Sequence, residues 1–221
     1  MDRKEWIVER RRIMEERFDT LWAPIYDQEW GATIAPTHAA MYARFLALCQ
    51  PGGWILDAAC GTGKYWPLAL DAGIVVFGLD QSAGMLQQAK AKYPQVAIAK
   101  LGLREMSFWG AFDGASCMDA MECVFPEDWP VVLANFQRAL KPGAPFYFTV
   151  ELADEAGIRQ AYEAGLQAGH PLEYGEWLEG EGYHYYPRLE QVREWLAAAG
   201  FTVIEETTGD EYQHYLVRKA S

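Results

Sequence analysis

Short apolar runs alternate with helix-length segments between residues 54 and 151, and this alternation restricts the fold more than any other feature. The runs are WILDA (54–58), VVFGLD (75–80), VAIAKL (96–101), FDGASCMD (112–119) and PFYFTVE (145–151). Helices are expected between them at 64–72, 82–92 and 127–140, the second capped by Ser82. Strands that alternate with helices pair in parallel through crossover connections. The sequence therefore predicts a parallel α/β sheet.

The two ends of the chain depart from this alternation. Residues 4–22 and 37–49 carry apolar side chains at helical spacing and predict two N-terminal helices. A helix near 188–199 is followed by two extended runs, FTVIEETTG and YQHYLVRK, with only a few residues between them. So short a connection suits an antiparallel pair. We therefore expect the sheet to end in a hairpin.

The first apolar run leads into LDAACGTGKY (56–65), which has the glycine pattern of a ligand-binding turn. A dinucleotide fingerprint needs a glycine three residues after Gly63, and the residue there is Trp66. The phosphate loop that ends in Gly-Lys-Ser/Thr also fails, because Tyr65 follows the lysine. Asp57 would repel a pyrophosphate but suits a ligand that carries positive charge. The turn therefore favours a cationic ligand such as S-adenosylmethionine.

Asp80 ends the second run and is placed to accept hydrogen bonds from ribose hydroxyls. With the segments that follow, the chain resembles the class I S-adenosylmethionine-dependent methyltransferases of the small-molecule type. The matching segments, in order, are ILDAACGTG, VFGLDQSAGML, GLREMSFWGAFDGASCMDAMECV, RALKPGAPFYFTVE and AAGF, within roughly residues 37–218. The resemblance implies an α/β fold with a Rossmann-like, seven-stranded, mostly parallel sheet, helices on both faces and an antiparallel C-terminal hairpin.

The resemblance also implies S-adenosyl-L-methionine as cofactor and a set of residues that hold it. These are Asp57, Ala58, Ala59, Gly61, Gly63, Asp80, Gln81, Met85, Leu103, Arg104, Met118 and Asp119. Ala59 replaces the family's first glycine. Many members have an acid near the adenine amino group where this chain has Leu103 and Arg104, so a backbone contact to adenine is expected instead. Met118 and Asp119 are expected beside the methionine moiety.

We expect one domain over residues 1–221. An N-terminal helical cap would cover 1–50, a cofactor-binding core 51–151, and a C-terminal helix and hairpin 188–221. The segment 152–187, rich in glycine, glutamate and tyrosine, is expected to be an insertion over the carboxyl ends of the strands, where ligands bind in open α/β sheets.

Residues for the acceptor side are harder to choose, because methyl transfer mostly requires that the acceptor be held in line and close. The candidate catalytic residues are Glu122, His184 and Tyr26. For Glu122, capping a helix is an equal alternative to a role in catalysis. For His184, the alternative is a hydrogen-bonded histidine that lies beneath a lid. The candidate substrate-binding residues are Trp22, Trp30, Tyr183, Tyr185, Tyr186 and His214. For His214, a strand position satisfied by its neighbours is the alternative.

Composition limits the partners. The net charge of -12, with no long basic stripe, argues against nucleic acid and favours a small-molecule substrate. No apolar run approaches the length that spans a membrane, and the four cysteines lack paired spacing, so we expect a cytoplasmic protein with no membrane partner, as a monomer or homodimer.

No metal is predicted, because the four histidines do not pair with cysteines or acids at ligand spacing in the sequence. Two alternatives to a methyltransferase stay open. One is a non-catalytic S-adenosylmethionine-binding or regulatory protein, because a cofactor loop says little about the acceptor site. The other is a nicotinamide-dependent oxidoreductase, which Trp66 and Asp57 disfavour.

Overall fold

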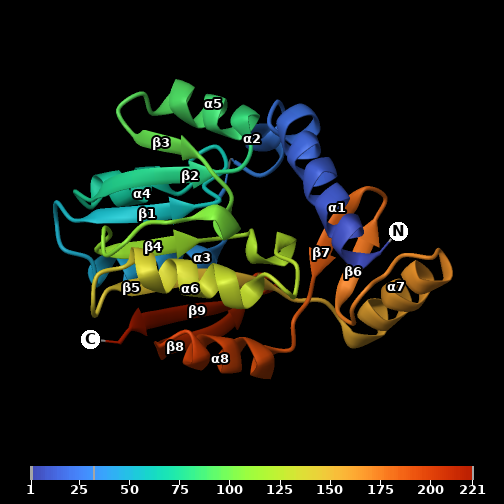
Figure 1. Cartoon of the computed structure of the whole chain (residues 1–221). Helices are drawn as coiled ribbons and strands as arrows, with labels where there is room; N and C mark the ends of the chain where they lie inside the picture. The colour runs from blue at the N-terminus through green and yellow to red at the C-terminus, as the bar shows by residue number, and fades with distance from the viewer. Residues whose placement is uncertain (1, 32, 221) are drawn as a thin grey trace.

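A seven-stranded sheet forms the centre of the protein (Figure 1), in a computed structural model that describes residues 2–31 and 33–220. The strand order is β3-β2-β1-β4-β5-β9-β8. The parallel strands are β1 (Trp54–Ala58), β2 (Val75–Asp80), β3 (Ala97–Lys100), β4 (Gly114–Cys117) and β5 (Pro145–Glu151). β9 (Tyr212–Lys219) runs antiparallel to β5 and to β8 (Phe201–Gly209). The predicted sheet and its C-terminal hairpin are confirmed.

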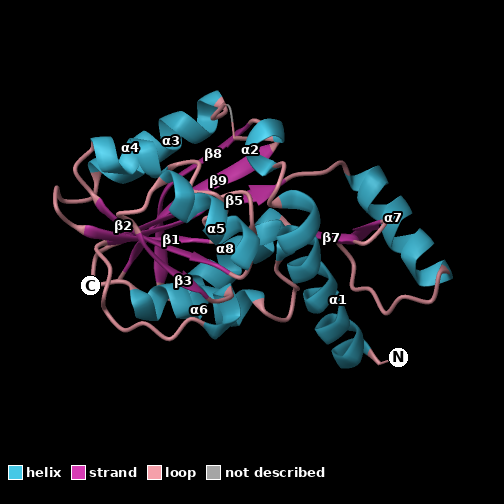
Figure 2. Ribbon diagram, turned by 90° about the horizontal axis from the view of Figure 1, so that it is seen from above, coloured by secondary structure: helices cyan, strands magenta, loops and turns pink. Residues whose placement is uncertain are grey.

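Helices cover both faces of this sheet, as predicted. On one face α3 (Pro36–Ala47), α4 (Trp66–Asp71) and α5 (Ala83–Lys92) share an apolar core cluster. On the other, α6 (Trp129–Ala139) and α8 (Leu189–Ala198) bury their apolar sides in a second cluster. Figure 2 shows α3 and α4 on one side of the strands and α6 on the opposite side. Both faces of the parallel strands are therefore buried, as parallel sheets require.

The N-terminal segment lies across the carboxyl ends of the parallel strands (Figure 1). It consists of α1 (Arg3–Arg17), the π-helical turn η1 (Phe18–Trp22) and α2 (Tyr26–Glu29). Asp19 accepts hydrogen bonds from Ser82 Oγ (2.6 Å) and from the backbone N–H of Gly84 (2.9 Å), at the start of α5. Thr62 Oγ1 donates to Asp27 Oδ1 at 2.5 Å. We call these contacts the N-terminal clasp, because they fix the segment to two turns of the sheet.

The segment 152–187 contains elements that the sequence analysis did not assign. α7 (Glu155–Gln167) is capped by Asp154, which accepts from the N–H of Gly157 at 2.8 Å. β6 (Glu176–Glu179) and β7 (Gly182–Tyr185) form a separate antiparallel sheet. The fully buried Glu176 accepts from Tyr183 Oη (2.6 Å) and from Arg3 (2.7 Å), so this small sheet is fixed against α1. Among the described residues, no helix is long and apolar enough to cross a membrane.

Trp66 explains why the glycine turn lacks its third glycine. Its indole lies against Gly63 and against Gly78 of β2, where an added Cβ would come within 2.4 Å of the ring. Trp66 Nε1 donates to Asp57 Oδ2 at 2.8 Å, and Ser116 Oγ donates to Asp57 Oδ1 at 2.7 Å. Close helix–strand approach here comes from a glycine on the strand, which leaves room for an indole that binds the acid.

Ala59 takes a backbone conformation that favours glycine. Its φ is +55°, and Gly61 and Gly63 in the same turn have φ values of +52° and +79°. An L-residue in this left-handed region is strained by roughly 1 kcal/mol relative to glycine. The family's first glycine is thus replaced by the smallest side chain that carries the strain.

Ala59→Gly is expected to raise the free energy of unfolding by about 1 kcal/mol, because glycine relieves the strain at positive φ. Chemical denaturation of the two proteins measures the difference. The control is Ala58→Gly: Ala58 is buried in β1, so that change should lower stability. Equal losses in both variants would contradict the assignment of strain to residue 59.

Gly78→Ala is expected to lower the free energy of unfolding by about 1–3 kcal/mol, because the new methyl group overlaps the Trp66 ring. A double-mutant cycle with Trp66→Leu isolates this contact: the double variant should be more stable than the sum of the two single losses predicts. Strict additivity would show that the contact with Trp66 does not cause the loss.

Candidate active site

A cavity opens at the carboxyl ends of β1, β2 and β4, beneath α1. The sheet reverses its building direction between β1 and β4, and ligands of open α/β sheets bind at such a point. Its empty volume, counted out to the open mouth, is about 1160 Å³. Of the residues predicted to hold a cofactor, those that line the cavity are Asp57, Ala59, Gly61, Asp80, Gln81, Met85, Leu103, Arg104, Met118 and Asp119. Ala58 and Gly63 lie in the same segment but do not line it.

Two buried acids, Asp57 and Asp80, stand at the base of the cavity. Asp80 accepts from the backbone N–H groups of Gly61 and Ser82, each at 2.8 Å, so it ties the glycine turn to the start of α5. Burial raises the pKa of both carboxyls to about 6, although the hydrogen bonds that each accepts oppose the rise. Asp80 therefore holds the turn before α5 in place, while the cap of this helix is Ser82, which accepts from the N–H of Met85.

Asp119 follows β4 with a φ of +53°, and it is held from three sides. His38 Nε2 donates to its Oδ1 at 2.8 Å, Tyr65 Oη donates to its Oδ2 at 3.1 Å, and its backbone N–H donates to Thr149 Oγ1 at 2.8 Å. Burial alone would raise the pKa of this carboxyl, but the bond and charge of His38 outweigh it and the pKa is lowered. Asp119 is thus an ionised carboxylate in the wall of the cavity.

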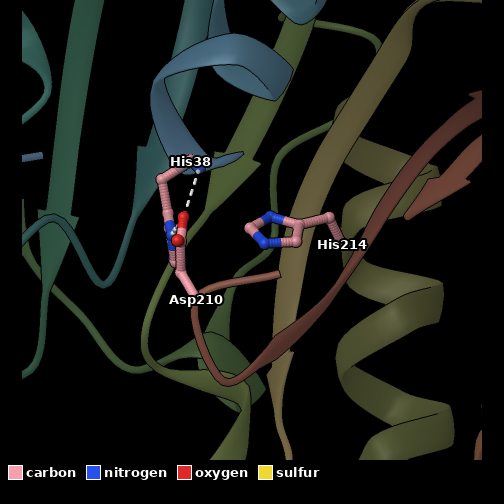
Figure 3. A group of neighbouring side chains, drawn as sticks. All are labelled: His38, Asp210 and His214. Carbon is pink, nitrogen blue, oxygen red and sulfur yellow. Dashed lines mark hydrogen bonds and ion pairs between the residues drawn. The ribbon is translucent and has the colours of Figure 1, made fainter. Parts of the chain in front are cut away.

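Behind Asp119, two histidines and an acid meet (Figure 3). One ligand atom each from His38, Asp210 and His214 lies within 4.8 Å of the others, a grouping that the sequence did not suggest because its members come from distant segments. His214 Nε2 donates to the carbonyl of Gly209 (3.1 Å), and Tyr147 Oη donates to His214 Nδ1 (2.8 Å). Both ring nitrogens of His214 therefore have hydrogen-bond partners within the protein, and we assign the group a structural role. In this role His214 packs against His38, and the two rings meet nearly at a right angle (80°).

Next to the turn η2 (Leu103–Glu105), apolar side chains line the cavity. They are Leu79, Met85, Leu101 and Leu103, with the polar Gln81, Arg104 and Glu105 beside them. Asn135 of α6 donates to the carbonyls of Leu103 and Arg104 at 3.0 and 2.9 Å, which fixes this turn in place. A planar, weakly polar group such as a nucleobase suits these walls.

One side of the cavity is lined by residues that the sequence analysis placed on a helix without assigning them to the site. Arg11, Met14 and Phe18 line the cavity from α1 and η1. Tyr26, a predicted catalytic residue, lines it from α2, and burial together with the charge of Asp119 raises the pKa of its phenol. The amphipathic spacing of residues 4–22 was the sequence signal available for these side chains. That spacing does not distinguish side chains packed in a core from side chains that cover a ligand site.

The other two predicted catalytic residues, Glu122 and His184, do not line the cavity, and a residue that was not predicted, Glu151, bonds His184 and acts on Glu122 through its charge. Glu122 lies in η3 (Met121–Cys123), which packs against β5 and β7. Glu151, at the end of β5, bonds His184 Nδ1 at 2.6 Å, and Tyr186 Oη lies 3.3 Å from the same nitrogen. Glu151 was missed because it ends an ordinary apolar run.

The remaining predicted substrate-binding residues do not line the cavity. Trp22 and Trp30 pack edge to face at 5.0 Å, with Trp30 partly exposed beside Tyr26. Tyr183 is buried against Phe125 (4.2 Å between ring centroids) and donates to Glu176. Tyr185 and His214 are also buried, the histidine with internal partners on both nitrogens. These three side chains hold the cap and the hairpin rather than face a ligand.

Comparison with known proteins supports a relationship that the fold already suggests. Residues 55–143 match the family model described as "Methyltransferase domain". A demethylmenaquinone methyltransferase of Symbiobacterium thermophilum is 32% identical over 152 residues, which are 62% of this chain and 59% of that protein. A malonyl-[acyl-carrier protein] O-methyltransferase of Hamiltonella defensa is 30% identical over 111 residues, which are 50% of this chain and 43% of that protein. The matches thus span about half the length of these relatives.

Among solved structures, the magnesium protoporphyrin IX methyltransferase of Synechocystis PCC 6803 with bound S-adenosylhomocysteine superposes with a TM-score of 0.72. The match covers 96% of this chain and all of that chain (100%) at 17% identity, so it establishes the shared fold. The matched region, 55–143, holds the glycine turn, Asp80 and Asp119, the residues around which the cavity is built. Residues 55–143 thus form a methyltransferase domain, in a chain that has the fold of the S-adenosylmethionine-dependent methyltransferases.

Proposed function

We propose that this protein transfers a methyl group from S-adenosyl-L-methionine to a small organic acceptor. The observation that carries the proposal is the charge of the cavity, which five carboxyls line against three basic side chains. The carboxyls are those of Asp57, Asp80, Glu105, Asp119 and Asp128. Of the bases, Arg11 and Arg104 both pair with Asp128, and the charge of Lys64 acts on Asp119. A ligand with an ammonium and a sulfonium supplies positive charge to a wall that is otherwise negative.

The residues present fit such a cofactor. The apolar end between Met85 and Leu103 suits adenine, and Asp80 keeps lone pairs for ribose hydroxyls beyond the two backbone bonds that it accepts. Asp57 and Asp119 suit the methionine end. When bound, the cofactor supplies a methyl group already activated by its positively charged sulfur. The protein's part is to hold the acceptor close and in line and to keep water out, which Tyr26 and the N-terminal clasp support.

The proposal extends to the size of the acceptor, the partners of the protein, its location and its oligomeric state. A small acceptor is supported by the demethylmenaquinone methyltransferase among the relatives. The charge of -12 supports the absence of a nucleic-acid partner. We also propose a cytoplasmic location and a single chain or homodimer, supported by free, mostly buried cysteines.

A ligand screen tests the proposal directly. S-adenosylmethionine and S-adenosylhomocysteine are expected to raise the melting temperature, with about 2.7 kcal/mol of added stability at a hundredfold excess over Kd. NADH and NADPH should have no effect. Incubation with methyl-labelled cofactor and a metabolite extract should then label a small molecule. Stabilisation by a nicotinamide cofactor alone would refute the proposal, and binding without any labelled product would favour a non-catalytic binder.

The affinity for S-adenosylmethionine is expected to fall as pH is lowered from about 7.5 to about 5. Asp57 and Asp80 have a pKa of about 6 in the ligand-free protein, so acid protonates them and removes the negative charge that attracts the cation. The expected loss lies between about tenfold and a hundredfold, since each proton that must leave costs about tenfold per pH unit below the pKa.

Calorimetry at each pH measures this loss, and uncharged adenosine is the control, for which the loss should be clearly smaller. The sign for folding is the opposite. Because the two folded-state pKa values lie above the unfolded value, these acids favour the ligand-free fold at low pH, and that contribution is lost as pH rises through about 6. An affinity that stays constant over the range would exclude a role for their charge in binding.

A further inference from the structure

One buried carboxyl beside the cavity has no use in the cofactor site. Glu122 is 5% exposed, and its Oε2 has no hydrogen-bond partner among the described residues. Burial, followed by the nearby charges of Glu151 and Asp119, raises the pKa of this carboxyl well above its ordinary range. An unpaired buried carboxyl is costly, so it calls for a partner from outside the chain.

The surroundings of Glu122 are acidic and phenolic. No basic side chain is among the charges that act on it, in the part of the chain that the structure describes. Its own charge raises the pKa of three phenols, those of Tyr26, Tyr186 and Tyr212, so it stands among them. Glu151 contacts the imidazole of His184, which is partly exposed (40%), and the phenol of Tyr186. Within the described residues, the surroundings of Glu122 thus include a second carboxyl and three aromatic rings, but no lysine or arginine among the charges that act on it.

This position adjoins the cavity where the reactive methyl group is expected. Cys123, the next residue after Glu122, lines the cavity, and so do Asp119 and Tyr26. β7, which carries His184, lies beside α1 at the carboxyl ends of the strands (Figure 1). A molecule on the Glu122 side therefore meets the methionine end of the cavity rather than its apolar adenine end.

We propose that the methyl acceptor is a basic amine and that Glu122 and Glu151 bind its nitrogen. The inference rests on the proposed methyl transfer and names its substrate class. An amine or ammonium offers an N–H donor to the unpartnered Oε2 of Glu122 and a positive charge that no described lysine or arginine supplies there, and aromatic rings also favour a cation. A carboxylate or phosphate acceptor would meet two like charges, and a neutral alcohol would leave the acidic pair uncompensated.

The same carboxyl accounts for the proton of the reaction. The bound ammonium first gives one proton to the carboxylate of Glu122, which frees the lone pair of the nitrogen. The lone pair then forms the new bond to the methyl carbon, the carbon–sulfur bond breaks, and its electron pair stays on sulfur as a neutral thioether. The positive charge stays on the methylated nitrogen. A carboxyl that readily holds a proton suits this task, and Glu151, whose charge acts on Glu122, bonds the partly exposed His184.

Binding of three probes of similar size tests the proposal without knowledge of the natural acceptor. Phenethylamine, 2-phenylethanol and 3-phenylpropanoate are titrated by calorimetry into the full chain saturated with S-adenosylhomocysteine. We expect phenethylamine to bind at least about tenfold more tightly than the other two. Glu122→Gln should reduce that affinity about tenfold, because a charge-assisted hydrogen bond becomes a neutral one, and should leave the affinity for S-adenosylhomocysteine unchanged.

Glu163→Gln, on the exposed side of α7, is the matched control and should change neither affinity. If Glu122→Gln does not fold, Glu151→Gln takes its place with the same expectation. Phenethylamine that binds no better than the alcohol or the acid, or not at all, overturns the amine assignment, and so does unchanged affinity in the glutamine variant. A chain that fails to bind S-adenosylhomocysteine refutes the proposed function instead, so the two failures are distinguishable.

Discussion

The buried carboxyl of Asp57 is the constraint on which the site depends. An acid at the junction of β1 and β4 has to be satisfied by donors, and Trp66 and Ser116 provide them. Trp66 can reach Asp57 only because Gly78 leaves space on β2. The turn that follows must then bend sharply enough to pass the indole, which it does through positive φ at Ala59, Gly61 and Gly63. The shape of the cavity base follows from this one acid.

Much of this architecture could be predicted from the sequence, because it depends on local patterns. Apolar runs that end in Asp57 and Asp80 gave the positions of two strands, and Ser82 is the cap of α5 that the sequence indicates. The two C-terminal strands follow from apolar and β-branched residues separated by Asp210 and Glu211, both in turn conformation with positive φ. Local propensity and tertiary structure agree at these positions, and where they agree sequence reasoning succeeds.

The parts that could not be predicted depend on contacts between distant segments. Glu151 has no local signal, and it joins the site only because β5 ends beside η3 and β7. Glu176 resembles a surface acid in a polar segment, yet Arg3 and Tyr183 bury it completely. The aromatic side chains at 183 and 185 suggested a ligand wall, but their alternation along β7 places them inward while His184 and Tyr186 face the other side. A strand of four residues in a glycine-rich segment gives too little pattern to reveal this.

The N-terminal clasp makes the lid and the ligand parts of one equilibrium. Asp19 binds the start of α5, and Asp27 binds the glycine turn. These are the two turns that face the cavity, so any molecule that orders them also strengthens the attachment of the lid. By thermodynamic reciprocity, a well-attached lid must raise the affinity for that molecule by the same factor. The attachment of the N-terminal segment therefore contributes to the free energy of ligand binding, although most residues of this segment touch no ligand.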